Sequence, residues 1–413
     1  MNTTPSSTQR ILWVQVWGLS LVQGAISLTW VIYNLYLVRL LTQFGFSETF
    51  AVVLLALENI LAAVIEPLMG NFSDRLQHQI GTRFPFIAMG MILSSACFLG
   101  IPVVLVFGGP SGGMRWLLPS MMVAWAIAMT LFRSPALSLL GRYAFRTQLP
   151  QAASILTLVG GLAGALAPLT GSFILRLGPL FTFFIGSFSL LAAAFALRAA
   201  GPNRQIADES QVNVEKRTVK TANAISATPI NTVAINRLAL IFGTGMGVAL
   251  GFRLMMQTLP RILSEQIPDT NTNLVLGTVF LSLALTAIPM GKLVTKVGTR
   301  LSMAGGLGLM TILTMFMLNS TYPAIAFGIA IAIGTCFSVV SNTTIPFALS
   351  MVPAQKAGLG TGLYFSGGAV AMSLYGMAIS QGIELSSGLG ATLGSAAFLW
   401  AAVCVFASMK TAK

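Results

Sequence analysis

A series of long apolar stretches is the feature that most limits how this 413-residue chain can fold. A helix needs roughly 20 apolar residues to cross the hydrocarbon core of a bilayer. Twelve such stretches are present, at residues 11–41, 50–69, 84–106, 116–140, 152–175, 180–197, 238–259, 274–294, 301–317, 323–346, 359–381 and 389–409. They predict an all-α membrane protein with twelve transmembrane helices.

The scarcity of charge excludes several classes of protein. Only 8% of the residues are charged and 55% are hydrophobic, whereas a soluble domain carries about 25% charged residues. A soluble enzyme, a nucleic-acid-binding protein and a disordered scaffold are therefore excluded. The single histidine, His78, lies in a polar segment, and the sequence holds no phosphate-binding G-x-x-x-x-G-K-[ST] loop. We expect no enzyme activity, no metal site and no cofactor.

The basic residues are distributed unevenly between the two sides of the expected membrane. An even number of spans places both termini on one side, and 17 of the 23 Lys and Arg residues fall on that side. Four fall on the opposite side and two lie within spans. Because cytoplasmic loops carry an excess of Lys and Arg, we expect an integral protein of the plasma (inner) membrane with both termini in the cytoplasm.

The chain divides into two halves of six spans each. Residues 1–197 are expected to form an N-terminal six-helix bundle and residues 238–413 a C-terminal one, joined by a polar cytoplasmic linker at 198–237. A motif repeats between the halves: residues 69–75 (MGNFSDR) end the second span and residues 290–296 (MGKLVTK) end the eighth. The repeat indicates two parallel, pseudo-symmetric bundles.

The first copy of this motif carries a family resemblance. Residues 70–83 resemble the signature loop G-x-x-x-D-R-x-G-R-R of the major facilitator superfamily. Residues 83–87 (RFPFI), 58–60 (ENI) and 66–70 (EPLMG) are similar to the sucrose–proton and glycoside–cation symporters of that superfamily. The resemblance implies the major facilitator fold and secondary active transport by alternating access. It further implies proton-coupled symport of a sugar or a similar small organic solute.

Three charged residues, Glu58, Arg133 and Arg253, are expected well inside the spans. A charge at the centre of a membrane helix costs at least about 2.5–3.5 kcal/mol, so such residues face a cavity or a partner. Glu58 is either the proton site of a symporter or a structural acid. Arg133 forms either a switchable or a permanent ion pair, and the acids within its reach are Glu58, Glu66 and Asp74. Arg253 either contacts an anion or hydroxyl group, or snorkels to the interface.

Polar residues within the spans are candidates for a substrate cavity. Gln23, Ser27, Trp30 and Asn34 recur at spacings of 4, 3 and 4, which places them on one helical face. Amides and hydroxyls hydrogen-bond polyols, and an indole ring stacks on a sugar ring, although the same groups also join membrane helices to each other. The other candidates for the cavity are Gln257, Asn342 and Thr344.

The repeated motif also predicts a gate. Gly70 allows close helix contact, and Asp74 is expected to accept hydrogen bonds from N–H groups at the start of a helix near Leu359, where the helix dipole is positive. Loss of this contact would open the cytoplasmic side. The other residues assigned to the gate are Arg75, Gly81 and Arg83 of the first copy, and Gly291, Lys296 and Arg300 of the second.

These patterns favour a monomeric, proton-coupled secondary transporter of a small-molecule substrate, embedded in the lipid bilayer and with no nucleic-acid partner. Two alternatives remain. An exporter of amphipathic compounds or lipid would suit the 20 methionines and 26 phenylalanines. A non-transporting assembly factor for pigment–protein complexes would be favoured by a loss of transport charges.

Overall fold

The computed structural model describes residues 11–108, 112–202, 235–268, 270–319 and 321–410. All regular structure in these ranges is helical, and twelve helical segments there are long and apolar enough to cross a membrane. The prediction of an all-α protein with twelve spans is therefore confirmed. Of the predicted linker at 198–237, residues 203–234 lie outside the described ranges.

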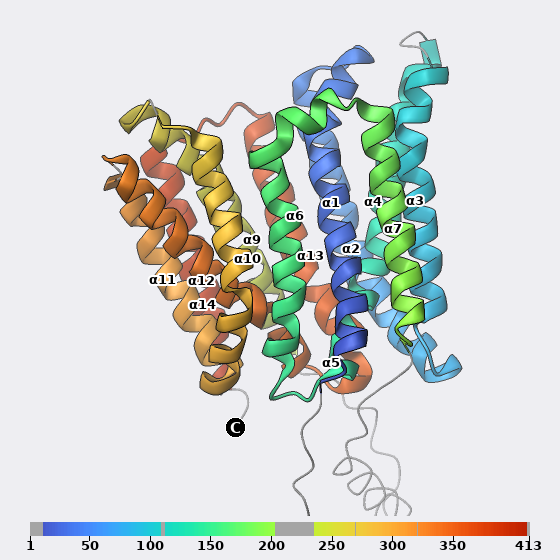
Figure 1. The fold of residues 1–413 in the computed structure, drawn as a ribbon, viewed down its shortest axis with the longest axis vertical. Coiled ribbons are helices and arrows are strands. Elements are labelled where there is room, and N and C mark those ends of the chain that lie inside the picture. Colours follow the sequence, from blue (N-terminus) through green and yellow to red (C-terminus); the bar gives the residue numbers. More distant parts are fainter. Residues whose placement is uncertain (1–10, 109–111, 203–234, 269, 320, 411–413) are drawn as a thin grey trace, which may run out of the picture.

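The helices preceding the linker are α1 (Trp13–Gln43), α2 (Glu48–Ile80), α3 (Phe84–Phe107), α4 (Leu117–Ser138), the short α5 (Leu140–Tyr143), α6 (Leu149–Arg176) and α7 (Pro179–Ala199). Those following it are α9 (Ile235–Gln266), α10 (Thr272–Val297), α11 (Thr299–Phe316), α12 (Pro323–Ser350), α13 (Ala357–Ser380) and α14 (Ser387–Lys410). Figure 1 shows that α1 begins and α14 ends at the same end of the molecule, which we call the terminal side.

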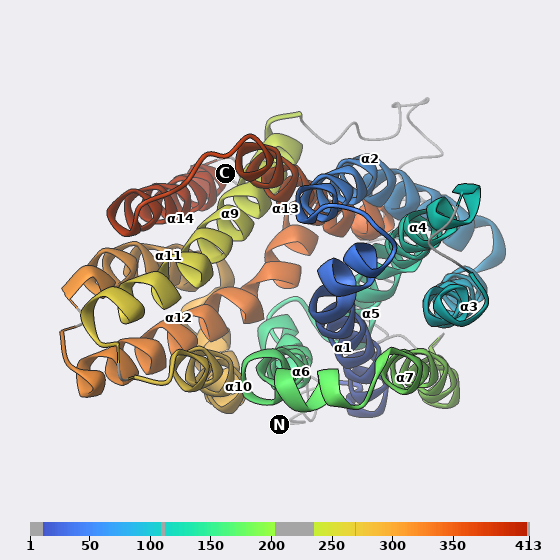
Figure 2. The same ribbon diagram turned by 90° about the horizontal axis from the view of Figure 1, so that it is seen from above.

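Viewed along the helices, α1–α7 lie together on one side and α9–α14 on the other (Figure 2). Each group encloses a cluster of buried apolar residues, and the cluster of the first group extends to Ile345, Leu349 and Ala357 of the second. The groups meet where α2 packs against α13 and where α6 packs against α10. Large apolar side chains on the outside, such as Phe107, Phe195 and Leu285, are exposed, as expected for helices that face lipid.

The main departure from the predicted boundaries is in α2. Hydropathy predicts a span that ends at residue 69 and a loop at 70–81, but the helix continues to Ile80. It ends at Gly81, whose φ of 81° is left-handed, a conformation typical of the residue that closes a helix. The helix α9 likewise extends beyond the predicted 259 to Gln266. Hydropathy detects the apolar part of a helix, whereas both of these helices continue through polar residues.

Candidate functional site

The motif in α2 holds the two groups of helices together on the terminal side. Asp74 accepts hydrogen bonds from the backbone N–H groups of Gly358 and Leu359, each at 2.9 Å. These are the first residues of α13, whose N–H groups have no partner within the helix and whose dipole favours a negative charge. The sequence predicts this contact between Asp74 and a helix start near Leu359.

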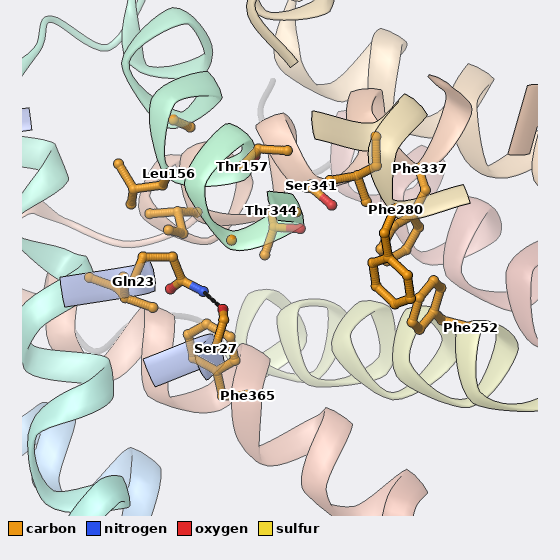
Figure 3. A pocket seen from close by; sticks show the side chains of 16 residues that line it. Gln23, Ser27, Leu156, Thr157, Phe252, Phe280, Phe337, Ser341, Thr344 and Phe365 are labelled. Carbon is orange, nitrogen blue, oxygen red and sulfur yellow. Dashed lines mark hydrogen bonds between the residues drawn. The ribbon is translucent and has the colours of Figure 1, made fainter. Parts of the chain in front are cut away.

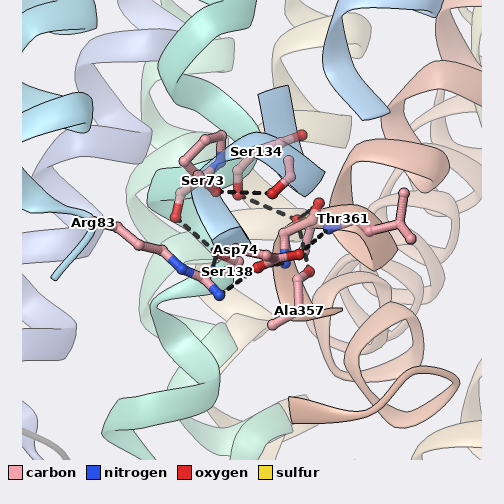
Figure 4. Close-up of polar contacts among 11 residues, drawn as sticks. Ser73, Asp74, Arg83, Ser134, Ser138, Ala357 and Thr361 are labelled. Atoms are coloured by element: carbon pink, nitrogen blue, oxygen red, sulfur yellow. Dashed lines mark hydrogen bonds and ion pairs between the residues drawn. The ribbon is translucent and has the colours of Figure 1, made fainter. Parts of the chain in front are cut away.

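Arg83 holds the Asp74 carboxylate in place. The Arg83 guanidinium forms an ion pair with Asp74 and donates to the hydroxyl of Ser138 at the end of α4. Figure 4 shows Arg83 and Asp74 side by side, close to the start of α13. Arg83 is buried, and burial lowers the pKa of its guanidinium while the Asp74 carboxylate opposes that shift. A single network therefore joins α2, α4 and α13.

The backbones of α2 and α13 approach closely at the same place. A Cβ atom built on Gly70 would lie 2.1 Å from the carbonyl oxygen of Gly358, and one built on Gly358 would lie 2.4 Å from the carbonyl oxygen of Gly70. Both distances are far below van der Waals contact, so only glycine fits at either position. The two groups of helices are therefore in backbone contact on the terminal side, beside the hydrogen bonds of Asp74.

We expect the Gly70→Ala substitution to loosen the terminal-side contact. Overpacking costs about 1–3 kcal/mol, which corresponds to an increase of roughly 5–150-fold in the opening equilibrium. Hydrogen–deuterium exchange of the peptide covering residues 354–362 should accelerate by that factor. The control is Gly305→Ala in α11, where an added Cβ meets nothing within 4 Å. Equal exchange in both variants would contradict the prediction.

The remaining residues assigned to the gate have varied surroundings. Arg75 and Lys296 are exposed, and Gly81 closes α2. In the second copy of the motif, an added Cβ on Gly291 would lie 2.6 Å from the Ser154 Cβ, and Arg300 donates to the carbonyl oxygen of Ser408 at 3.0 Å. Thr295 stands where the first copy has Asp74, and its hydroxyl donates to the Gly291 carbonyl within its own helix. The acid-to-helix contact of the first copy therefore has no equivalent at Thr295.

Arg133 pairs with Glu66, one of the three acids that the sequence placed within its reach. The ion pair joins α4 to α2, and the Glu66 side chain is completely buried. The Ser134 hydroxyl also donates to Glu66. On its other side the Arg133 guanidinium lies over the Phe365 ring of α13, 4.6 Å from the ring centroid. Arg133 is thus in contact with both groups of helices.

Glu58 is buried, with 3% of its surface exposed. Its Oε1 accepts a hydrogen bond from the Tyr33 hydroxyl, and its Oε2 has no hydrogen-bond partner among the described residues. The ion pairs found in the described ranges do not include Glu58. Tyr33 packs against Trp125 with ring centroids 4.4 Å apart, and Trp30 packs against both rings. Glu58 is therefore a carboxyl group in aromatic surroundings without a cationic partner.

Cavities lie between the groups of helices, and two of them are lined by residues predicted for the substrate cavity. The first, the central cavity, has a volume of about 250 Å³. Its polar lining includes Gln23 and Ser27, whose side chains are hydrogen-bonded at 3.2 Å, and Thr344 (Figure 3). Its apolar lining includes four aromatic residues, Phe252, Phe280, Phe337 and Phe365. The cavity thus combines a small polar face with a larger apolar one that includes aromatic rings.

The second, which we call the arginine cavity, has a volume of about 410 Å³ and is lined by Arg133 and Arg253. The other polar and aromatic residues lining it are Trp30, Asn34, Asn59, Gln257 and Tyr375. The four polar residues on one face of α1, which we call the α1 stripe, therefore line both cavities. Gln23 and Ser27 line the central cavity, and Trp30 and Asn34 line the arginine cavity. Phe365 lines the central cavity, and the Arg133 guanidinium, which lines the arginine cavity, lies over its ring. The contact between Phe365 and Arg133 therefore lies between the two cavities.

Asn342 departs from its predicted place in the cavity. It is completely buried, lines neither cavity, and donates from its side-chain amide to the Ala287 carbonyl of α10 at 2.8 Å. It thus joins two helices, a role that amides often have in membrane bundles. Sequence reasoning also omitted Glu66 and Tyr33 from the candidate site. An acid beside a proline within an apolar stretch was a signal for Glu66, whereas a tyrosine in a span gave none for Tyr33.

The comparisons with known proteins agree with this architecture. The family model described as Major Facilitator Superfamily matches residues 19–376. A search of curated protein sequences gives no match. Among solved structures, the chain is similar to the human organic anion transporter MFSD10, with a TM-score of 0.67 and 13% identity, covering 95% of this chain and 99% of that one.

Two sugar transporters have similar folds. The Escherichia coli fucose–proton symporter FucP gives a TM-score of 0.65 at 11% identity, with 96% of this chain and 99% of that one covered. The proton–xylose symporter XylE gives 0.65 at 12%, with 96% and 95% covered. At these identities the likeness shows the fold alone, whereas the family model covers most of the chain. The chain therefore belongs to the major facilitator superfamily, a family of secondary transporters and not of enzymes.

Proposed function

We propose that this protein is a proton-coupled symporter of a small polar organic solute, with Glu58 as the group that carries the proton. The observation that supports this most strongly is the burial of Glu58 with one oxygen unpartnered and no ion pair. An ionised carboxylate in such surroundings is costly, and binding a proton removes its charge. Protonation of Glu58 therefore changes the stability of the conformation that buries it.

The contact between the two groups of helices suggests how alternating access would work. In our proposal the bundles 1–197 and 238–413 rock against each other, and the terminal side, closed here by Asp74 and Gly70, faces the cytoplasm. The excess of Lys and Arg on the terminal side supports this orientation. The gate opens when Asp74 leaves the start of α13.

The α1 stripe supports a polar organic solute. Gln23 and Ser27 offer an amide and a hydroxyl group in the central cavity, and Asn34 and Trp30 offer an amide and an indole ring in the arginine cavity. A sugar suits such a surface. By their names, two of the structures with a similar fold are proton-coupled transporters of fucose and xylose, and a third transports organic anions. These neighbours motivate the choice of solutes to test.

A proton-flux assay tests the proposal. The purified protein is reconstituted into proteoliposomes that contain a pH-sensitive dye, and neutral sugars and sugar acids are added in turn. We expect at least one of them to drive proton entry, detected as acidification of the lumen. Protein-free liposomes are the control. If none of the solutes moves protons although some bind the protein, symport is refuted.

The aromatic face of the central cavity favours a second candidate function. Phe252, Phe280, Phe337 and Phe365 line much of this cavity and would suit the apolar part of an amphipathic compound or lipid that is exported. The same proteoliposomes, loaded with a fluorescent amphiphile and given an opposing pH gradient, would then show efflux. A non-transporting assembly factor would show movement in neither assay.

A further inference from the structure

We propose that the arginine cavity binds the carboxylate of a small hydroxylated organic acid, held by Arg133 and Arg253. The inference rests on the proposed function, because it names the chemical class of the transported solute. It starts from the charge of the cavity, whose lining contains two guanidinium groups and no Asp or Glu. A cavity of that composition favours an anion over a neutral ligand.

Both arginines have capacity to bind an anion. Arg133 gives one terminal nitrogen to Glu66, but its Nε is buried and has no hydrogen-bond partner among the described residues. Arg253 is exposed, lies over the Tyr375 ring at 5.1 Å from the centroid, and forms no ion pair within the described ranges. Guanidinium groups bind carboxylates strongly, because their N–H groups match the two oxygens.

The other polar groups of the cavity suit hydroxyl groups. Asn34 and Asn59 each donate from their side-chain amide to a backbone carbonyl one turn earlier, at 2.7 Å, which leaves their side-chain oxygens as acceptors. The Oε1 of Gln257 and the Nε1 of Trp30 are buried and have no hydrogen-bond partner in the part of the chain that the structure describes. A ligand hydroxyl group can donate to these side-chain oxygens and accept from the indole N–H.

The position of the cavity fits a transported ligand. Arg133 belongs to α4 and Arg253 to α9, so one anion between them would contact both groups of helices. The volume of about 410 Å³ falls within the range of about 300–1,000 Å³ that is usual for small-molecule sites. A carboxylate on Arg133 also competes with Glu66 for the same guanidinium, which ties solute binding to the buried ion pair.

The test compares two probes that differ by one carboxylate, D-glucuronate and D-glucose. Binding to the purified full chain is measured by isothermal titration calorimetry at constant ionic strength. We expect glucuronate to bind about tenfold more tightly than glucose or better. The Arg253→Gln variant should lose that preference, whereas Arg253→Lys should retain part of it.

The matched control is Arg115→Gln. Arg115 also lies over aromatic rings, 5.4 Å from Phe46 and 5.5 Å from Trp116, but it does not line the cavity. This variant should bind both probes as the unmodified protein does. Equal affinity for the two probes in the unmodified protein, or an unchanged preference in Arg253→Gln, overturns the inference. If Arg253→Gln does not fold, the comparison of probes and Arg253→Lys still decide it.

Binding and transport fail separately in this design. If glucuronate binds selectively but neither probe moves protons in proteoliposomes, the proposed symport is wrong and the anion site stands. If glucose drives proton entry and glucuronate does not bind, the symport stands and the anion site is wrong.

Discussion

The Arg133→Met substitution should destabilise the protein by about 3–5 kcal/mol, the cost of breaking a buried ion pair by removing one partner. Glu66 is fully buried and would keep only the Ser134 hydroxyl as a donor. Its charge would then have no ion-pair partner at membrane depth. Methionine keeps an unbranched side chain at this position but has no guanidinium to lie over the Phe365 ring.

A double-mutant cycle shows whether the cost comes from the uncompensated acid. Adding Glu66→Gln to Arg133→Met removes the unpaired charge, so the double variant should regain most of the lost stability. The free energy of unfolding is measured by titration with sodium dodecyl sulfate in mixed micelles. Arg176→Met, at an exposed position at the end of α6, is the control for loss of a positive charge. A double variant no more stable than Arg133→Met would contradict the pairing.

The ion pair also shows where sequence reasoning stops. A helix rises about 1.5 Å per residue, so the sequence places Arg133 at a height between Glu58 and Glu66, which lie about 12 Å apart along α2. The choice between them depends on how α4 is rotated against α2, and that rotation is set by packing across the bundle. Three partners were therefore compatible with the sequence, and the structure selects Glu66.

The twelve spans and the Asp74 contact were predictable for physical reasons. Crossing a bilayer requires a length of apolar chain, which is visible in a single sequence. Asp74 lies in a repeated motif and is expected near a helix start rich in glycine, so it has few alternative partners. Asn342 was not predictable in the same way, because an amide that lines a cavity and one that joins two helices have the same sequence pattern. The end of α2 was missed because its last turns are polar.

Glu58→Gln should abolish proton-driven accumulation of the solute. At one proton per solute, a gradient of about one pH unit supports roughly a tenfold concentration ratio, because each tenfold ratio corresponds to about 1.4 kcal/mol. Glutamine has the same shape and still accepts from the Tyr33 hydroxyl, but it does not titrate. The ratio should therefore fall to one, while exchange of labelled for unlabelled solute across the membrane continues. Uptake is measured in proteoliposomes with and without a pH gradient.

Two variants separate coupling from structural damage. Glu48→Gln removes an exposed acid from the first turn of the same helix, so its accumulation ratio should equal that of the unmodified protein. Tyr33→Phe removes the hydrogen bond to Glu58 but keeps the titrating carboxyl group. It should therefore still accumulate solute, with an altered dependence on external pH. If Glu58→Gln accumulates solute as the unmodified protein does, the proton travels by another group. The buried acids of α2 that then remain are Glu66, paired with Arg133, and Asp74, paired with Arg83. One of these ion pairs would have to break on each cycle.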